Sequence, residues 1–89
     1  MGRRYFAYII RCGTGQLYTG YTNDLDKRLL QHNLGKGARF TRGRGPVELV
    51  YFEEFDSKGE AMTREAAIKR LTREQKLEMI AVMENDRKQ

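Results

Sequence analysis

The sequence predicts an α+β fold, in which helices flank a three-stranded antiparallel sheet in the order ββα-βαα. Two observations support this fold class. Three segments are rich in aromatic and β-branched residues, and between and after them lie segments with helical periodicity. The length of 89 residues also leaves room for one hydrophobic core only. We therefore expect a single domain over residues 1–89.

The three strands are predicted from composition. Residues 5–12 (YFAYIIRC) and 17–22 (LYTGYT) read as the two strands of a hairpin, because the intervening GTGQ is a glycine-rich turn. Residues 47–55 (VELVYFEEF) form the third strand. The LVYF at its centre is apolar at consecutive positions, so we expect this strand to be covered on both faces.

The helices follow from capping signals. The segment NDLDKRLLQHNLG is predicted to be a helix that Thr22 or Asn23 caps and Gly35 ends. SKGE has the Ser-x-x-Glu spacing of a capping box and opens a second helix that ends near Leu71. TREQ repeats the signal and opens a last helix over residues 72–84, which leaves residues 85–89 as a frayed tail.

Charge and composition narrow the range of possible functions. The net charge is +5, and Lys and Arg exceed Asp and Glu only within residues 1–46. Such a basic half fits either a polyanion-binding face or a surface kept charged for solubility. The single cysteine, Cys12, fits a reducing compartment, and one cysteine with one histidine cannot build a structural zinc site. Because the sequence has no long apolar run and no signal-peptide pattern, we expect a cytoplasmic protein with no membrane contact.

Two tyrosines of the hairpin raise a question of register. If the connection has an odd number of residues centred on Gly13, Tyr8 lies directly across from Tyr18 on one face of the sheet. An even-numbered connection would place the two side chains on opposite faces. Taken alone, such a pair is ordinary sheet packing.

Three further residues could carry chemistry. Arg28 and His32 are an i, i+4 pair at the edge of the apolar stripe of the first helix. They fit either an amphipathic helix with polar borders, which the pair alone favours, or a phosphate-neutralising Arg beside a proton-transferring His. Glu65 projects from the apolar side of its helix, which fits an ion pair with an arginine as well as it fits a Mg²⁺ or Mn²⁺ ligand.

The glycine-rich segment 35–46 (GKGARFTRGRGP) is predicted to be a loop. It carries four cations around Phe40, a combination that suits phosphate contact and base stacking better than a merely solvated loop. The four cations are Lys36, Arg39, Arg42 and Arg44.

Taken in order, these residues resemble the GIY-YIG nuclease superfamily, and the small single-domain bacterial proteins within it most of all. AYI, with Tyr8, stands at the position of the GIY motif, and YTG, with Tyr18, at that of YIG. RLLQH matches the family's Arg and the His four residues later, and REAAIK matches the helix with the metal-binding glutamate. The resemblance covers residues 5–71. The asparagine that many catalytic members carry after that helix has no equivalent, since Asn85 lies in the tail.

The resemblance implies an endonuclease that hydrolyses phosphodiester bonds in DNA, rather than RNA, with one divalent metal, Mg²⁺ or Mn²⁺, in repair or recombination. By this resemblance Glu65 holds the metal, Tyr8 with His32 takes a proton from water, Arg28 stabilises phosphoryl charge and Tyr18 orients water or phosphate. Gly20 allows a close backbone approach. The alternatives are a non-catalytic DNA- or RNA-binding module on the same scaffold and a structural component of a repair complex. A protein partner could supply specificity.

Overall fold

The computed structural model describes residues 4–37 and 41–87 and confirms the predicted α+β fold. Within these residues the elements follow the order ββα-βαα, with strands paired in the order β2-β1-β3. All strand pairs are antiparallel. The elements are β1 (Tyr5–Cys12), β2 (Leu17–Thr22), α1 (Leu25–Asn33), β3 (Val47–Phe55), α2 (Lys58–Lys69) and α3 (Arg73–Arg87).

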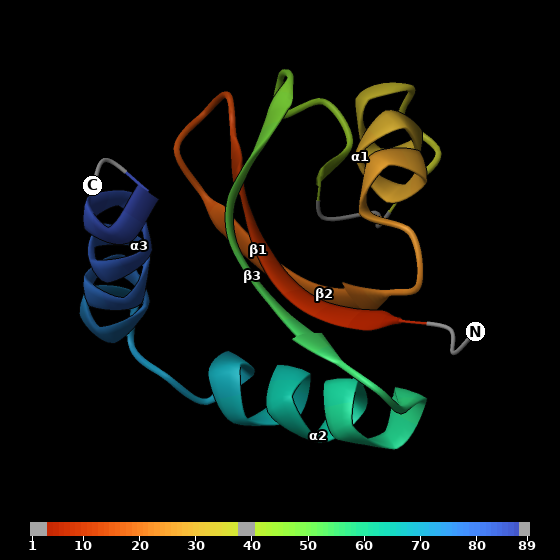
Figure 1. Ribbon diagram of the computed structural model, residues 1–89. Coiled ribbons are helices and arrows are strands. Elements are labelled where there is room, and N and C mark those ends of the chain that lie inside the picture. Colours follow the sequence, from red (N-terminus) through yellow and green to blue (C-terminus); the bar gives the residue numbers. More distant parts are fainter. Residues whose placement is uncertain (1–3, 38–40, 88–89) are drawn as a thin grey trace.

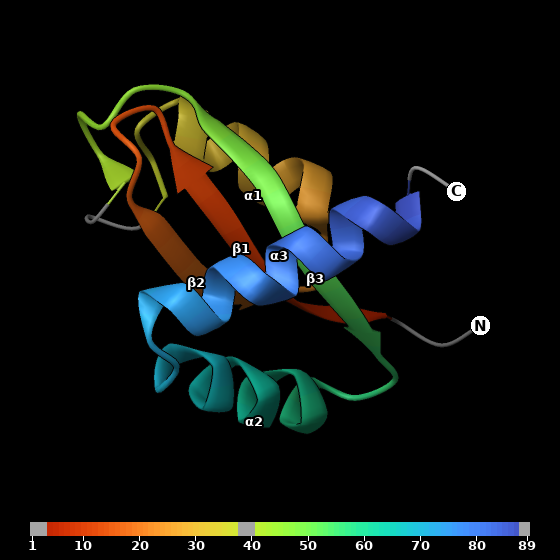
Figure 2. The same cartoon turned by 90° about the vertical axis from the view of Figure 1, so that its left-hand side faces the viewer.

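Helices cover both faces of the curved sheet (Figure 1). Helix α1 lies on one face, and α2 and α3 lie on the other, where α3 crosses in front of the strands in Figure 2. Each face has its own buried cluster. Ala7 and Ile9 pack with Ile68 of α2 and Ile80 of α3, whereas Tyr8 and its neighbours pack against α1. Alternate residues of β1 therefore serve the two clusters.

Strand β3 contributes to both clusters, as its composition predicts. Leu49 and Phe52 pack on the α1 side, and Val50 and Tyr51 pack on the side of α2 and α3. Two consecutive residues can share a face because the β1–β3 register shifts between Ile9 and Ile10. The bulge places Val50 and Tyr51 on the same side of the sheet.

The hairpin register differs from the predicted one. Tyr8 pairs with Gly20, and Tyr18 pairs with Ile10, so the two tyrosines share a face but are not directly opposite. The last β1–β2 pair, Arg11 with Leu17, encloses an odd number of residues centred on Thr14, not Gly13. The cause is the turn itself. The N–H of Cys12 donates to Gln16 at 2.8 Å, and Gly15 takes a positive φ of 97°.

The helix ends mostly follow the sequence signals. Ser57 accepts from the N–H of Glu60, and Thr72 and Gln75 cap each other reciprocally, as the two capping boxes predict. Two details differ. The N-cap of α1 is Asp24, whose carboxylate accepts from the N–H of Lys27, whereas Thr22 or Asn23 was expected. Helix α3 continues to Arg87, three residues past the expected end, into the segment predicted to fray.

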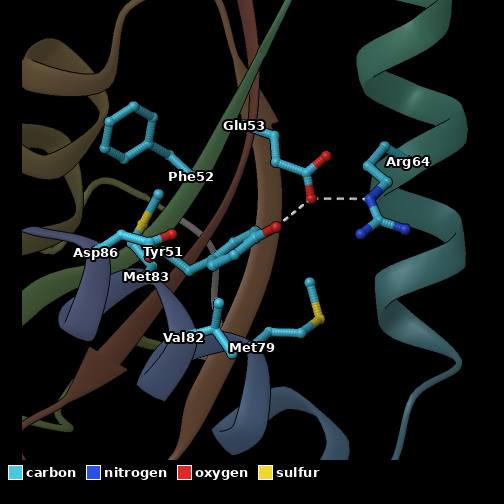
Figure 3. Close-up of a pocket in the computed structure, with 8 residues that line it drawn as sticks. All are labelled: Tyr51, Phe52, Glu53, Arg64, Met79, Val82, Met83 and Asp86. Carbon is cyan, nitrogen blue, oxygen red and sulfur yellow. Dashed lines mark hydrogen bonds and ion pairs between the residues drawn. The ribbon is translucent and has the colours of Figure 1, made fainter.

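The face opposite α1 holds a cavity of about 400 Å³ between β3, α2 and α3 (Figure 3). A polar network borders it, in which the Tyr51 hydroxyl and Arg64 Nε, the latter at 2.9 Å, both donate to Glu53 Oε2.

Among the residues that the structure describes, no helix has both the length and the apolar character that a bilayer crossing requires.

Thr19 on β2 is buried, and its hydroxyl has no hydrogen-bond partner in the described part of the chain. A buried hydroxyl without a partner is destabilising, and valine has nearly the same shape. We expect Thr19→Val to raise the free energy of unfolding by about 1 kcal/mol, measured by urea denaturation. Thr63→Val, at an exposed site on α2, should change it little, and equal stability of Thr19→Val and wild type would contradict the assignment.

Candidate active site

Four of the five predicted catalytic residues converge on the α1 face of the sheet. Tyr8 of β1 and Tyr18 of β2 point to this face, because both belong to the cluster under α1. Arg28 and His32 lie one turn apart on α1 and point back toward the strands, where His32 contacts both tyrosine rings edge-on. The hairpin and the helix thus bring together residues up to 24 positions apart in the chain.

The Tyr8 hydroxyl lies at the centre of this cluster. Its oxygen is 3.2 Å from Nε2 of His32 and accepts a hydrogen bond from Nε of Arg28 at 3.3 Å. Tyr8 is 2% exposed, so these contacts are shielded from bulk water. Arg28 is only half-buried, and its Nη1 donates to Gln31 Oε1 at 3.2 Å. Arg28 therefore joins the buried hydroxyl to the molecular surface.

His32 is buried, whereas the sequence placed it at the edge of the core. The difference comes from the loop after α1, which folds back over the imidazole. Thr41 Oγ1 lies 2.9 Å from Nδ1, and a Cβ on Gly37 would collide with the ring. Sequence reasoning missed both Thr41 and Gly37, since helical periodicity carries no signal for a contact made by a loop. The glycine-rich character of segment 35–46, which contains both residues, was the only indication.

Burial dominates the electrostatics of the site. Desolvation raises the pKa of Tyr8 above its ordinary value, and the hydrogen bond and charge of Arg28 offset this only in part. Burial and the Arg28 charge both lower the pKa of His32, which is therefore neutral at pH 7.

Gly20 makes the central contact possible. It pairs with Tyr8 across the hairpin, and a Cβ at this position would lie 2.5 Å from the Tyr8 hydroxyl oxygen. No side chain other than hydrogen fits there without displacing the ring. The close approach expected of Gly20 is thus an approach of its own backbone to Tyr8.

Glu65, the fifth residue, lies on α2, which packs against the opposite face of the sheet from α1. Its side chain is 17% exposed and shares the inward stripe of the helix with the buried Ala61 and Ile68, as predicted. The carboxylate pairs with Lys69 at 3.4 Å, so its partner is a lysine one turn away and not an arginine. Burial is the main cause of the raised pKa of Tyr8, and the Glu65 charge makes the smallest contribution in the same direction.

A lone carboxylate is a suitable ligand for Mg²⁺ or Mn²⁺, ions that keep several waters in their coordination shell. The described residues contain no group of three acidic, His or Cys side chains that could hold a metal. Glu65 is mostly buried, and within residues 4–37 and 41–87 its carboxylate pairs with Lys69 alone, whose side chain is 52% exposed, so the pair offsets little of the charge. Glu65 therefore fits the role of a single protein ligand that would hold a divalent cation.

The basic loop is partly described. Lys36 and Arg42 are exposed, and Arg44 is half-buried, with its backbone bonded to Thr14 of the hairpin turn. Arg39, like Phe40, lies outside the described residues. Asn33 anchors the end of the loop by accepting from the N–H of Val47 at 2.7 Å.

The antiparallel sheet carries two tyrosines that face an Arg–His helix, in the order of the residues that resemble a nuclease family. A family model described as the GIY-YIG catalytic domain matches residues 4–78, and the chain belongs to this family. GIY-YIG nucleases act on nucleic acid and generally use a divalent metal.

Small bacterial relatives are similar over nearly the whole chain. The UPF0213 protein CPE1444 of Clostridium perfringens is 58% identical over 76 residues, which cover 85% of this chain and 82% of that protein. The UPF0213 protein OB0043 of Oceanobacillus iheyensis is 49% identical over 86 residues, which cover 97% and 100%.

Two solved structures share the fold. The solution NMR structure of the UPF0213 protein BH0048 from Bacillus halodurans is 46% identical, with a TM-score of 0.57 over 89% of this chain and 84% of that one. The NMR structure of the protein EF2693 from E. faecalis is 38% identical, with a TM-score of 0.61 over 94% and 92%.

Proposed function

We propose that this chain is a metal-dependent endonuclease that hydrolyses phosphodiester bonds in DNA, in the context of repair or recombination. One observation carries the proposal: the Tyr8 hydroxyl is within hydrogen-bond distance of both a neutral imidazole and a guanidinium. A hydroxyl in this position can exchange protons with His32 while Arg28 holds a phosphate beside it. Sheet packing alone requires neither contact.

The protonation states define the order of proton transfer. Tyr8 is a phenol at neutral pH because its pKa is raised, and His32 is neutral because its pKa is lowered. Nδ1 of His32 can donate to Thr41, which leaves Nε2 free to accept. The Tyr8 oxygen then takes a proton from the attacking water as its own proton moves to Nε2. The imidazolium stores the proton while the phosphorus–oxygen bond to the leaving group breaks.

Glu65 would hold the divalent ion, which when bound polarises the phosphoryl oxygen and stabilises the leaving oxygen. Arg28 would neutralise charge on the phosphoryl group, and Tyr18 would orient water or phosphate. The Tyr18 ring packs edge-on against His32, with 5.5 Å between the ring centroids. The cations Lys36, Arg39, Arg42 and Arg44 would bind the nucleic-acid backbone. A protein partner would supply specificity.

Nicking of supercoiled plasmid and of branched DNA with Mg²⁺ or Mn²⁺ tests the proposal. Glu65→Gln keeps the shape of the side chain and removes the charge that would hold the cation, so we expect a loss of at least about 100-fold in rate. Glu78→Gln, an exposed carboxylate on α3, is the matched control and should cleave like wild type. Wild type without activity on any substrate would refute the enzyme, and unchanged Glu65→Gln would refute the metal site.

The pH dependence follows from the sign of the His32 shift. The proton acceptor must be neutral, so the rate is lost as the pH falls through the pKa of His32, which lies below the ordinary value of about 6.5. Above that value the single-turnover rate should form a plateau, because the raised pKa of Tyr8 adds no ionisation in the neutral range. A rate that instead rises steadily to about pH 9 would identify the Tyr8 phenolate as the base.

A further inference from the structure

A second pocket, of about 500 Å³, adjoins the candidate active site at the end of the sheet where β1 begins and β2 ends. Arg28 belongs to both sites, since it donates to the Tyr8 hydroxyl and also lines the pocket. A ligand held there would therefore be a direct neighbour of the reacting phosphate. The lining consists of Tyr5, Tyr21, Thr22, Asn23, Arg28 and Lys58.

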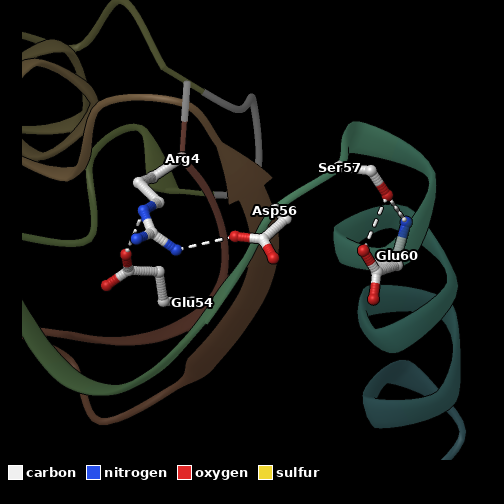
Figure 4. Close-up of polar contacts among 5 residues, drawn as sticks. All are labelled: Arg4, Glu54, Asp56, Ser57 and Glu60. Atoms are coloured by element: carbon white, nitrogen blue, oxygen red, sulfur yellow. Dashed lines mark hydrogen bonds and ion pairs between the residues drawn. The ribbon is translucent and has the colours of Figure 1, made fainter. Parts of the chain in front are cut away.

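The charge of this pocket selects an anion. Arg28 comes from α1 and Lys58 from the first turn of α2, while no lining residue in the described chain is acidic. Two carboxylates at the end of β3 are engaged by another cation. Arg4 pairs with Glu54 at 3.0 Å and with Asp56 at 2.7 Å, at the end of β3 (Figure 4). Two cations from separate elements therefore face a polar cavity without an opposing charge from its walls.

The remaining walls offer aromatic surface. Tyr5 and Tyr21 are both half-buried. Both point to the α2 side of the sheet, because Tyr21 pairs with Ala7, which packs there, and Tyr5 is two residues from Ala7 on the same strand. Tyrosine rings beside cations are the combination that binds a nucleobase together with its phosphate.

We infer that this pocket binds the nucleotide next to the cleaved bond, with its phosphate on Arg28 and Lys58 and its base against Tyr5 and Tyr21. The inference rests on the proposed function, which it extends to the class of substrate. A base can contact these rings only when it is not stacked and paired within a duplex. The preferred substrate is therefore DNA with an unpaired nucleotide beside the cut, such as a single strand or a flap.

Fluorescence anisotropy in EDTA tests binding without cleavage, with a labelled oligothymidine of about 12 nucleotides and a duplex of equal length. We expect wild type to bind the single strand more tightly than the duplex. Tyr21→Leu should weaken single-strand binding about tenfold, whereas Tyr21→Phe keeps the ring and should bind like wild type. Lys58→Gln should weaken binding and reduce the log–log salt slope by about 0.7.

Lys76→Gln is the control for charge. It removes one positive charge on α3, where Lys76 lines a pocket with Gln16 and Leu17 at the start of β2, the opposite end of that strand from the proposed nucleotide pocket. Lys76→Gln should therefore weaken single-strand binding less than Lys58→Gln does. If Tyr21→Leu does not fold, Tyr5→Leu and Lys58→Gln carry the same test.

The outcomes separate the two proposals. Cleavage by wild type with Lys58→Gln and Tyr21→Leu unchanged in binding would overturn this inference and leave the nuclease intact. The predicted binding pattern without cleavage in Mg²⁺ or Mn²⁺ would overturn the nuclease proposal and leave the nucleotide-binding pocket intact. Tighter binding of the duplex, or no binding of the single strand, would overturn the inference outright.

Discussion

Replacing Tyr8 by phenylalanine is expected to lower the cleavage rate at least about 100-fold and to leave the fold intact. The ring keeps its packing in the buried cluster under α1, and only the hydroxyl is lost. Without that oxygen, His32 has no proton to receive and Arg28 loses an acceptor. Single-turnover nicking at saturating metal measures the effect, and thermal unfolding verifies the fold.

Tyr51→Phe is the matched control for this prediction. It also removes a partly buried hydroxyl, but one that donates to Glu53 on the opposite face of the sheet (Figure 3). It should cleave at the wild-type rate with a small loss of stability. If Tyr8→Phe cleaved as fast as Tyr51→Phe, the Tyr8 hydroxyl could not be the group that accepts the proton of water.

The second large effect is expected at Gly20. An added Cβ would lie 2.5 Å from Oη and 2.7 Å from Cζ of Tyr8, a ring that is 2% exposed and packed in the cluster under α1. Gly20→Ala should therefore displace the hydroxyl from His32 and lower activity nearly as far as Tyr8→Phe does. We also expect a loss of about 1–3 kcal/mol in the free energy of unfolding.

Gly59→Ala provides the comparison. Gly59 lies in α2 with open space around its Cβ position, so alanine should stabilise the protein by about 0.5–1 kcal/mol through helix propensity alone. The two Gly→Ala substitutions should thus move stability in opposite directions in denaturant titrations. Wild-type activity in Gly20→Ala would show that the contact between Gly20 and Tyr8 has no role in the reaction.

The elements of this fold could be predicted because their signals are local. The capping boxes at Ser57 and Thr72 and the glycine turn of the hairpin act over a few residues, and the structure confirms each of them. The predicted register of the hairpin is wrong because the register depends on which hydrogen bond closes the turn. That bond joins Cys12 to Gln16, a choice that composition alone does not specify.

The candidate site shows the same limit. Helical spacing placed Arg28 and His32 side by side, and the face parity of the hairpin added Tyr8 and Tyr18. Neither pattern could show that His32 would be buried, because that burial comes from contacts made across the loop after α1. Helical spacing could have predicted the lysine partner of Glu65, since the two residues are an i, i+4 pair.

The loop that covers His32 has a consequence for how this protein can change in evolution or in engineering. Surface loops usually accept insertions and deletions, because little depends on their length. Here Gly37 and Thr41 contact the imidazole from two points of the same loop, and both positions are fixed by the ring between them. A residue gained or lost between these two points would move one contact away from the histidine. For the burial of His32, the length of this loop is therefore expected to matter more than the side chains at described exposed positions such as Lys36 and Arg42.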